Sequence, residues 1–385
     1  MIDTITAVLD SRQFTDDDLM PFARMLAEGK TVAFPTETVY GLGADATNPV
    51  ALAAVFQAKG RPSDNPLIVH VAEVEQIREL TEEITPLARL LIQHFWPGPL
   101  TIILKKSDKV PEEVTAGLDT VALRMPAHPL ARRLIAMAGV PVAAPSANRS
   151  GRPSPTRGTH VMTDLMGRVD AIIDGGPCSV GLESTVVDAT GNVPVILRPG
   201  GITREMLENV VRQVDVDPSL LSVSRETSEG TPRSPGMKYT HYAPKARLVI
   251  AAGLQAPGEI QSPEMAARTL AVLWHRYQET EASIGILCTE ETGEILKKLL
   301  PKEGFLMKTL GSAAQPEVMA ACLFQLLREY DETDTTLILA QEVPETAMGF
   351  ALMNRLMKAA GYQRESVDQQ DIENNSGSST GNPIQ

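Results

Sequence analysis

The sequence predicts an α/β protein with a twisted mixed sheet in one domain and a smaller parallel sheet in another. Over most of the chain, short runs of β-branched residues alternate with segments of 3.6-residue apolar spacing, as strands alternate with helices. Strand-like runs within 171–197 follow one another without a helix, which indicates a mixed first sheet. Within 247–361 the two patterns alternate one to one, which favours a parallel second sheet.

The first domain is expected over residues 1–214. Helical spacing predicts helices at 16–28, 50–58, 86–95, 130–138 and 203–214. Apolar runs bounded by turn residues predict strands at 31–34, 67–71, 100–104, 121–124, 140–144, 171–174, 185–188 and 193–197. Polar or cationic residues recur where these strands end, so we expect a central ligand crevice at converging strand ends.

A linker over 215–245, a second domain over 246–362 and a tail over 363–385 complete the chain. The second domain has four strand–helix pairs, which predict a small Rossmann-like sheet: 248–252 with 264–277, 284–288 with 293–300, 305–309 with 316–330, and 336–340 with 344–360. Nothing in it resembles a nucleotide fingerprint. The tail is polar and contains no aromatic residue, which is typical of a disordered segment.

The linker is open to two interpretations. Ser, Thr, Pro and Gly dominate 222–236, as in a solvated tether. Residues 231–245 instead carry four basic side chains counting His241, two tyrosines and no acid. A functional role for this second half therefore stays open.

Composition narrows the class of protein. The chain has 385 residues and a formal net charge of -13, which argues against a protein that coats nucleic acid without specificity. Cys178, Cys288 and Cys322 are far apart and form no CxxC pair, so they read as buried thiols in a reducing compartment. No apolar run is long enough to span a membrane, and the first residues do not resemble a secretory signal, so we expect a cytoplasmic protein.

Common nucleotide and nucleophile motifs do not account for the chemistry. Residues 41–46 match a GxGxxG/A pattern, but the motif should lie directly between a strand and a helix and here does not. We interpret it as a flexible loop whose glycines let the backbone approach a ligand. The sequence contains neither a P-loop nor a GxSxG elbow.

Lys59 and Arg61 follow the helix predicted at 50–58. A helix C-terminus favours cations by a few tenths to about 1 kcal/mol, which explains one of them without a ligand. This helix-end effect does not explain why Asn65 and His70 follow on the next strand. A lone histidine on a strand is, however, more often a core residue with its hydrogen bonds satisfied than a ligand contact. Because Arg and Lys both suit phosphate, an anion site is the alternative.

Arg124 and Arg198 each end an apolar strand. Arginine is rarely buried unpaired, so each needs a carboxylate from the protein or from a ligand. Residues 145–160 contain three arginines and no acid, which predicts a local positive pocket in an acidic chain. Ser184 and Thr185 bring two hydroxyls to the start of another strand.

Several motifs resemble, in order, those of the YrdC-like threonylcarbamoyl-AMP synthases. They are FPTETVYGLG at 34–43, KGRPxxNPLIVH at 59–70, PSAN at 145–148, EST at 183–185 and RPGG at 198–201. The resemblance covers about residues 10–212, and HYAP at 241–244 with the following domain resembles the long two-domain form. The tail beyond Tyr362 lies outside it.

The resemblance implies condensation of L-threonine, bicarbonate and ATP to L-threonylcarbamoyl-AMP and pyrophosphate, with Mg²⁺ on the phosphates. The product would supply a downstream tRNA threonylcarbamoyl transferase complex that modifies the adenosine next to the anticodon, and direct tRNA binding would be weak. The carbamate formed on threonine can attack the α-phosphate itself, so cations, amides and hydroxyls that position reactants suffice.

The resemblance also assigns residues. Lys59 and Arg61 would be catalytic. The ATP-binding residues would be Lys59, Arg61, Asn65, Thr120, Ser146, Asn148, Ser154, Arg198 and Tyr242. The threonine-binding residues would be Thr36, His70, Arg124, Ala144 and Ser184. Because Tyr242 lies in the linker, the linker would act as a lid that excludes water, and no metal-binding residue is indicated.

Two other functions compete with this one. A non-catalytic RNA-binding module would use the positive crevice for a tRNA backbone and would bind with a steep salt dependence. A carbamoyl-transfer maturation enzyme can carry a similar domain, but its expected cysteine-rich zinc segments do not occur in this sequence.

Overall fold

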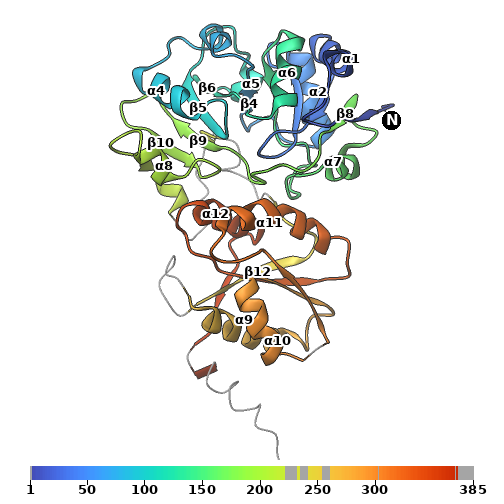
Figure 1. The fold of residues 1–385 in the computed structure, drawn as a ribbon, viewed down its shortest axis with the longest axis vertical. Helices are drawn as coiled ribbons and strands as arrows, with labels where there is room; N and C mark the ends of the chain where they lie inside the picture. Colours follow the sequence, from blue (N-terminus) through green and yellow to red (C-terminus); the bar gives the residue numbers. More distant parts are fainter. Residues whose placement is uncertain are drawn as a thin grey trace, which may run out of the picture. The chain divides into compact units, whose positions relative to one another are not determined.

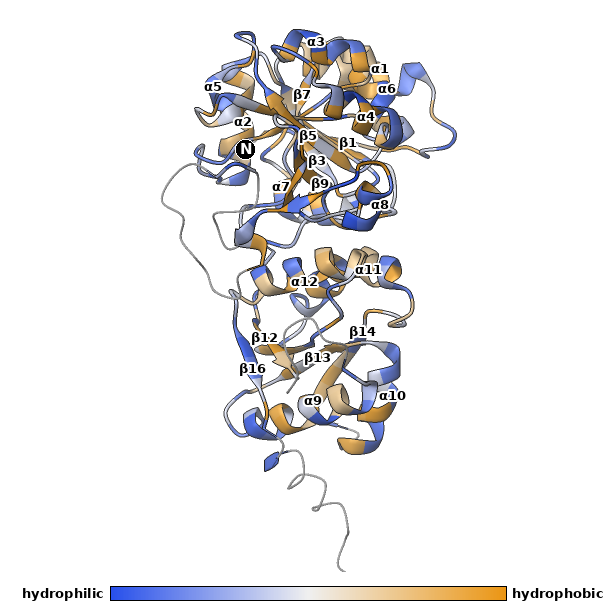
Figure 2. Cartoon of the chain, turned by 90° about the vertical axis from the view of Figure 1, so that its left-hand side faces the viewer, coloured by the Kyte–Doolittle hydropathy of each residue, from blue (hydrophilic) through white to orange (hydrophobic). Residues whose placement is uncertain are grey.

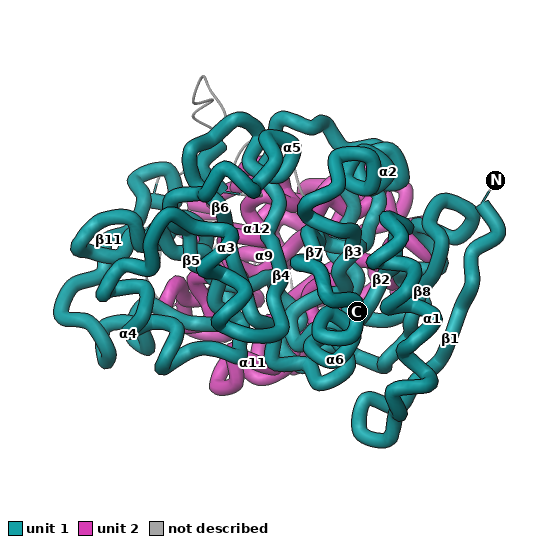
Figure 3. Tube along the Cα trace, turned by 90° about the horizontal axis from the view of Figure 1, so that it is seen from above, with its two compact units in different colours: residues 1–241 teal, residues 242–385 magenta. Residues whose placement is uncertain are grey.

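The computed structural model describes residues 2–221, 232–234, 242–253, 261–301, 303–368 and 370–371. The chain divides into two compact units, Met1–His241 and Tyr242–Gln385 (Figures 1 and 3). Most of the predicted linker, at 222–231 and 235–241, lies outside the described residues, as does the end of the predicted tail at 372–385.

Eleven strands form one mixed sheet in the described part of unit 1. Their order is β1-β8-β2-β3-β7-β4-β6-β5-β9-β10-β11. Their bounds are β1 Ile5–Val8, β2 Val32–Phe34, β3 Gly41–Asp45, β4 Ile68–His70, β5 Leu100–Lys105, β6 Thr120–Arg124, β7 Val142–Ala143, β8 Ala171–Asp174, β9 Thr185–Asp188, β10 Val195–Arg198 and β11 Asp215–Val216. Parallel and antiparallel pairs both occur, as predicted.

The helices of unit 1 have clear sequence signals at their ends. They are α1 Asp16–Ala27, α2 Pro49–Lys59, α3 Ile77–Leu80, α4 Pro86–Phe95, α5 Glu112–Thr115, α6 Pro129–Ala138, α7 Gly158–Leu165 and α8 Arg204–Glu208. Thr15 closes a capping box on α1, and the Asn48 side chain caps α2. Gly60 ends α2 in the left-handed conformation, which places Lys59 on the last helical turn.

Two helix layers cover the β1–β3 half of this sheet. Val32 and Phe34 pack with α1 and α6 in one core, whereas Ala33 packs with α2 and α7 in another. Successive strand residues point to opposite faces, so this alternation shows that both faces are buried. In Figure 2 the strands at the centre of unit 1 are largely coloured as apolar, whereas the helices around them carry both apolar and polar residues.

The other half of the sheet is covered unequally. Val69, Ile102 and Leu123 belong to a large core that includes α3 and α4 residues. The opposite face of β4, β6, β5, β9 and β10 carries a separate, smaller apolar cluster of Ile68, Ile103, Ala122, Val186 and Leu197. We call this second surface the Ile68 face.

The largest correction concerns Gly41–Asp45, which forms strand β3 and not a flexible loop. This strand is fully buried and pairs antiparallel with both β2 and β7. A Cβ on Gly43 would lie 2.6 Å from the Phe34 ring and 2.8 Å from Val142 Cγ1. The glycine therefore admits neighbouring side chains, not a ligand.

Smaller differences follow from weak periodicity. The helix predicted at 203–214 is only Arg204–Glu208, and β1, α7 and β11 were not expected. These elements are short or lie at the edge of the sheet, where an apolar pattern is incomplete. Most other predicted elements agree with the structure to within one or two residues.

Unit 2 contains a five-stranded, all-parallel sheet in its described part, in the order β14-β13-β15-β12-β16. The strands are β12 Arg247–Ala252, β13 Ile284–Cys288, β14 Phe305–Thr309, β15 Leu337–Gln341 and β16 Arg364–Ser366. The helices are α9 Pro263–Tyr277, α10 Glu290–Leu299, α11 Pro316–Tyr330 and α12 Met348–Ala359. In Figure 1, α9 and α10 lie on one side of this sheet and α11 and α12 on the other.

Strand β16 corrects the expected start of the disordered tail. We expected disorder from 363 onward, but Arg364–Ser366 pairs parallel with β12. Arg364 also forms an ion pair with Glu342. No helix among the described residues combines the length and the apolar character needed to cross a membrane.

The close contacts at Gly43 predict a specific loss of stability. Gly43→Ala should lower the free energy of unfolding by about 1–3 kcal/mol, because the new methyl group must displace Phe34 and Val142. Gly191→Ala is the matched control, since a Cβ there meets nothing within 4 Å. Urea unfolding measures both, and equal effects would contradict the packing argument.

Candidate functional site

Several predicted site residues share the Ile68 face of the sheet. Ala122 belongs to the apolar cluster of this face, so Thr120 and Arg124, two residues away on β6, point to the same side. His70 pairs with Arg124 across β4 and β6, and it therefore lies on this side too. The sequence predicted a site at converging strand ends. Thr120, Arg124 and His70 instead share one face of the sheet, and they lie at both ends of their strands.

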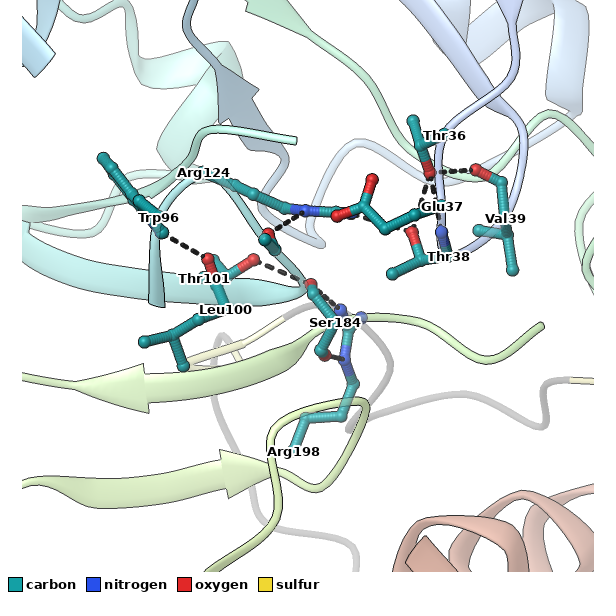
Figure 4. Close-up of polar contacts among 11 residues, drawn as sticks. Thr36, Glu37, Thr38, Val39, Trp96, Leu100, Thr101, Arg124, Ser184 and Arg198 are labelled. Atoms are coloured by element: carbon teal, nitrogen blue, oxygen red, sulfur yellow. Dashed lines mark hydrogen bonds and ion pairs between the residues drawn. The ribbon is translucent and has the colours of Figure 1, made fainter. Parts of the chain in front are cut away.

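Arg124 is held by three protein acceptors at the end of β6 (Figure 4). Its Nη2 donates to Glu37 Oε1 at 2.7 Å, its Nη1 to Thr38 Oγ1 at 2.9 Å, and its Nε to the Gly98 carbonyl at 3.3 Å. Arg124 is 3% exposed and Glu37 8%. Burial disfavours the charged Glu37 carboxylate, but the charge and hydrogen bond of Arg124, with smaller contributions from the backbone N–H groups of Ala127 and Glu37, hold its pKa below the usual value.

His70 is buried beside this ion pair. Burial, followed by the positive charge of Arg124, lowers the pKa of His70 from 6.5 to about 3. Its Nδ1 atom is buried and has no hydrogen-bond partner. His70 is therefore a neutral imidazole at physiological pH.

A second buried arginine lies on the neighbouring strands. Arg198 Nε donates to the Ser184 carbonyl at 3.1 Å, and its Nη2 donates to Ser184 Oγ at 3.1 Å. Ser184 Oγ also lies 2.7 Å from Thr101 Oγ1 of β5. Figure 4 shows Ser184 and Thr101 between the two arginines. The structure thus brings a predicted ATP residue and a predicted threonine residue into direct contact.

Lys59 forms a separate cluster with the loop after β7. Its Nζ donates to the carbonyls of Ser146 and Asn148 and lies 3.3 Å from Asn148 Oδ1. Ser146 Oγ donates to the same Oδ1 at 2.6 Å. Lys59 is 4% exposed, so this loop, and not only the helix C-terminus, holds its charge.

Arg61 and Asn65 lie between α2 and β4. Arg61 Nη2 donates to the carbonyls of Asn65 and Pro66, both at 3.1 Å. The Asn65 side chain is almost fully buried, yet neither its oxygen nor its nitrogen has a hydrogen-bond partner. Buried amides are normally satisfied, so Asn65 is suited to receive a ligand.

The remaining predicted residues are more scattered. Thr36 Oγ1 donates to the Val39 carbonyl at 2.6 Å and so shapes the loop that carries Glu37. Ala144 follows β7, and its amide donates to the Ile68 carbonyl. Ser154 Oγ donates to Glu183 Oε1 at 2.6 Å.

Two predicted ATP residues make none of the contacts described above. Thr120 begins β6, four residues and roughly 13 Å along the strand from Arg124. Tyr242 belongs to unit 2, where its ring stacks on Phe324 at a centroid distance of 5.1 Å and lies under the Arg355 guanidinium.

Glu37, Thr38 and Thr101 were not assigned a role from the sequence. The signal for Glu37 was present, because a buried Arg124 demands a carboxylate. The sequence left open whether the protein or a ligand supplies it, and the structure identifies Glu37. Thr101 gave no signal, since an internal strand threonine is ordinary.

The described residues do not offer a protein-only metal site. Within the described ranges, no group of three or more His, Cys, Asp or Glu side chains is arranged to hold a metal ion. None of the three cysteines forms a disulfide; Cys178 and Cys288 are buried and Cys322 is half-buried. Burial raises the pKa of Cys178 well above its usual value, so it stays protonated.

Comparison with known proteins identifies the family. The threonylcarbamoyl-AMP synthase of Bacillus subtilis (strain 168) is 47% identical over 355 residues, which cover 92% of this chain and 96% of that protein. The chain belongs to the threonylcarbamoyl-AMP synthase family. The synthase of Pyrococcus abyssi is 43% identical and covers 89% of this chain and 93% of its own length.

Family models and solved structures agree with this membership. A model described as Telomere recombination matches residues 24–200, and the C-terminal domain of threonylcarbamoyl-AMP synthase matches 202–361. The crystal structure of P. abyssi Sua5 complexed with L-threonine matches with a TM-score of 0.83 and 40% identity, over 95% of this chain and 99% of that one. The resemblance found in the sequence is confirmed.

The low pKa of His70 predicts an acid-dependent loss of stability. Below pH 6.5, His70 becomes protonated in the unfolded chain, whereas in the folded chain it stays neutral until about pH 3. The free energy of unfolding therefore falls as the pH falls from 6.5 to about 3. Between pH 7 and pH 5 the contribution is about 2 kcal/mol. His70→Gln should remove it, as measured by urea unfolding at both pH values.

The control for this experiment is His94→Gln, which changes an exposed histidine of α4. From pH 7 to pH 5, the free energy of unfolding of His94→Gln should fall by as much as that of the unmodified chain. If His70→Gln behaves like the control, His70 is not the neutral buried group described above.

Proposed function

We propose that this chain condenses L-threonine, bicarbonate and ATP to L-threonylcarbamoyl-AMP, pyrophosphate and water. Membership of the threonylcarbamoyl-AMP synthase family supports the reaction, and a relative with a TM-score of 0.83 has been crystallised with L-threonine. The threonylcarbamoyl group then passes to the tRNA adenosine next to the anticodon. We assign that transfer to a downstream complex, because the product is a mixed anhydride and not a modified base.

The proposed threonine site is supported by the polar groups that share the Ile68 face. Arg124 supplies a buried guanidinium for the threonine carboxylate, beside neutral His70 and the Ser184 hydroxyl. Thr36 and Ala144 complete the proposed threonine site. In such a low-dielectric setting, fixed donors bind charge more strongly than they do in water.

For ATP, we propose that the residues around Lys59 and Asn65 bind the nucleotide. Lys59, Arg61, Asn65, Thr120, Ser146, Asn148, Ser154, Arg198 and Tyr242 make up the proposed set. Lys59 already donates to the 146–148 loop, so we assign it two roles: it holds this loop and adds positive charge for the phosphates. Lys59 and Arg61 are the proposed catalytic residues, through stabilisation of developing negative charge.

We propose that Mg²⁺ takes part only as an ion bound to the phosphates of ATP. Magnesium usually keeps several waters and bridges phosphate oxygens instead of occupying an all-protein cage. Bound in this way it would neutralise phosphate charge. The side chains described above act by binding and orienting the reactants, and none of their roles requires a metal held by the protein.

The linker is proposed to cover the Ile68 face. Its described residues 232–234 include Arg233, which forms an ion pair with Asp188 at the end of β9. Asp188 lies two residues from Val186 of the apolar cluster, so the two side chains share that face. We also propose a cytoplasmic location, in line with three cysteines that form no disulfide, and only weak direct tRNA binding.

The reaction is tested by incubating the protein with L-threonine, labelled bicarbonate, ATP and Mg²⁺ and following pyrophosphate. We expect threonine-dependent pyrophosphate release and label in a nucleotide product. Salt-sensitive RNA affinity without turnover would instead favour the RNA-binding module. Absence of threonine-dependent release from well-folded protein would exclude the synthase.

Arg61→Ala tests the nucleotide side. It should weaken ATP binding by about 10- to 100-fold, the effect of one lost charge-assisted contact, while the melting temperature changes little because Arg61 is half-buried. Calorimetric titration with ATP measures the affinity. Arg168→Ala removes an exposed arginine of the same unit and should leave it unchanged. A collapse of thermal stability in Arg61→Ala would show a structural role instead.

A further inference from the structure

Glu37 is the one carboxylate that contacts Arg124 among the described residues. It lies in the loop between β2 and β3 and reaches the end of β6 from there. Oε1 accepts from Arg124, whereas Oε2 is buried and has no hydrogen-bond partner. In Figure 4 this second oxygen points away from the guanidinium. An ionised oxygen in this position calls for a donor, because a buried acceptor without one is costly.

Arg124 retains donors for a ligand despite its protein contacts. A guanidinium has five N–H groups. Three are used, one on each nitrogen, by Gly98, Thr38 and Glu37. One N–H remains on each terminal nitrogen, which matches the two oxygens of a carboxylate.

The Arg124–Glu37 pair therefore presents a cation and an anion side by side. An α-amino acid is the complementary ligand, because its carboxylate and ammonium are separated by a single carbon. Among the three proposed reactants, ATP and bicarbonate are anions that Glu37 repels, and threonine alone carries a cation. The threonine hydroxyl is neutral and forms a weaker bond to a carboxylate than an ammonium does.

We propose that Glu37 binds the α-amino group of the amino acid substrate through Oε2, while Arg124 binds the carboxylate. This assignment rests on the proposed function and adds a residue that selects α-amino acids over other hydroxy acids. Glu37 has a second role, since Oε1 orients Arg124. The two roles belong to different oxygens and can be separated by experiment.

The test compares two ligands, L-threonine and (R)-3-hydroxybutyrate, by calorimetric titration without ATP. The second ligand keeps the carboxylate and hydroxyl and lacks the amino group. The unmodified protein should bind threonine about 10- to 100-fold more tightly, the effect of one charge-assisted hydrogen bond. This comparison needs no variant, and equal affinities would overturn the proposal.

Glu37→Gln then separates ammonium binding from support of Arg124. Arg124 Nη2 needs an acceptor, so the amide oxygen must take the Oε1 position and the amide nitrogen the Oε2 position. A donor then faces the ammonium. Threonine affinity should fall by about 10- to 100-fold. The affinity for (R)-3-hydroxybutyrate should not fall, and it should rise if anything, because the variant no longer repels the ligand carboxylate.

Two further variants serve as references. Thr38→Val removes another acceptor of Arg124 and should weaken both ligands equally. Glu28→Gln changes an exposed acid and should affect neither. If Glu37→Gln also weakens both ligands equally, Glu37 acts only through Arg124 and the proposal is wrong. If the unmodified protein binds no threonine, the proposed function fails together with it.

Discussion

A buried guanidinium at the end of β6 constrains much of unit 1. Placing Arg124 at 3% exposure costs several kcal/mol unless the charge is paired and its hydrogen bonds are satisfied. The loop between β2 and β3 must therefore deliver Glu37 and Thr38 to it. Thr36 fixes the shape of that loop, and the glycines of β3 let the strand return through a closely packed core.

The same ion pair sets the electrostatics of the Ile68 face. Burial and the charge of Arg124 keep His70 neutral, and Arg124 keeps Glu37 ionised. Ser184 and Thr101 extend the polar network to Arg198. The proposed reaction needs positioned donors and no covalent nucleophile, and this surface offers buried donors in a low-dielectric setting.

The sequence predicted the architecture well, because strands and helices differ in apolar period. It failed at Gly41–Asp45, where glycines that admit Phe34 and Val142 look like a loop when read locally. The candidate residues could be found from family motifs in a fixed order, but the motifs did not show which of these residues contact one another. Arg198 contacts Ser184 although the two were assigned to different reactants. Tertiary pairing, such as that of Glu37 with Arg124, is set by topology and not by local spacing.

The central claim is that the Arg124–Glu37 pair on the Ile68 face holds the amino acid substrate. A crystal structure of this protein with L-threonine tests it most directly. The account predicts the threonine carboxylate on the terminal nitrogens of Arg124 and the amino group within hydrogen-bond distance of Glu37 Oε2. Threonine bound away from Arg124, or with its amino group turned away from Glu37, would contradict it.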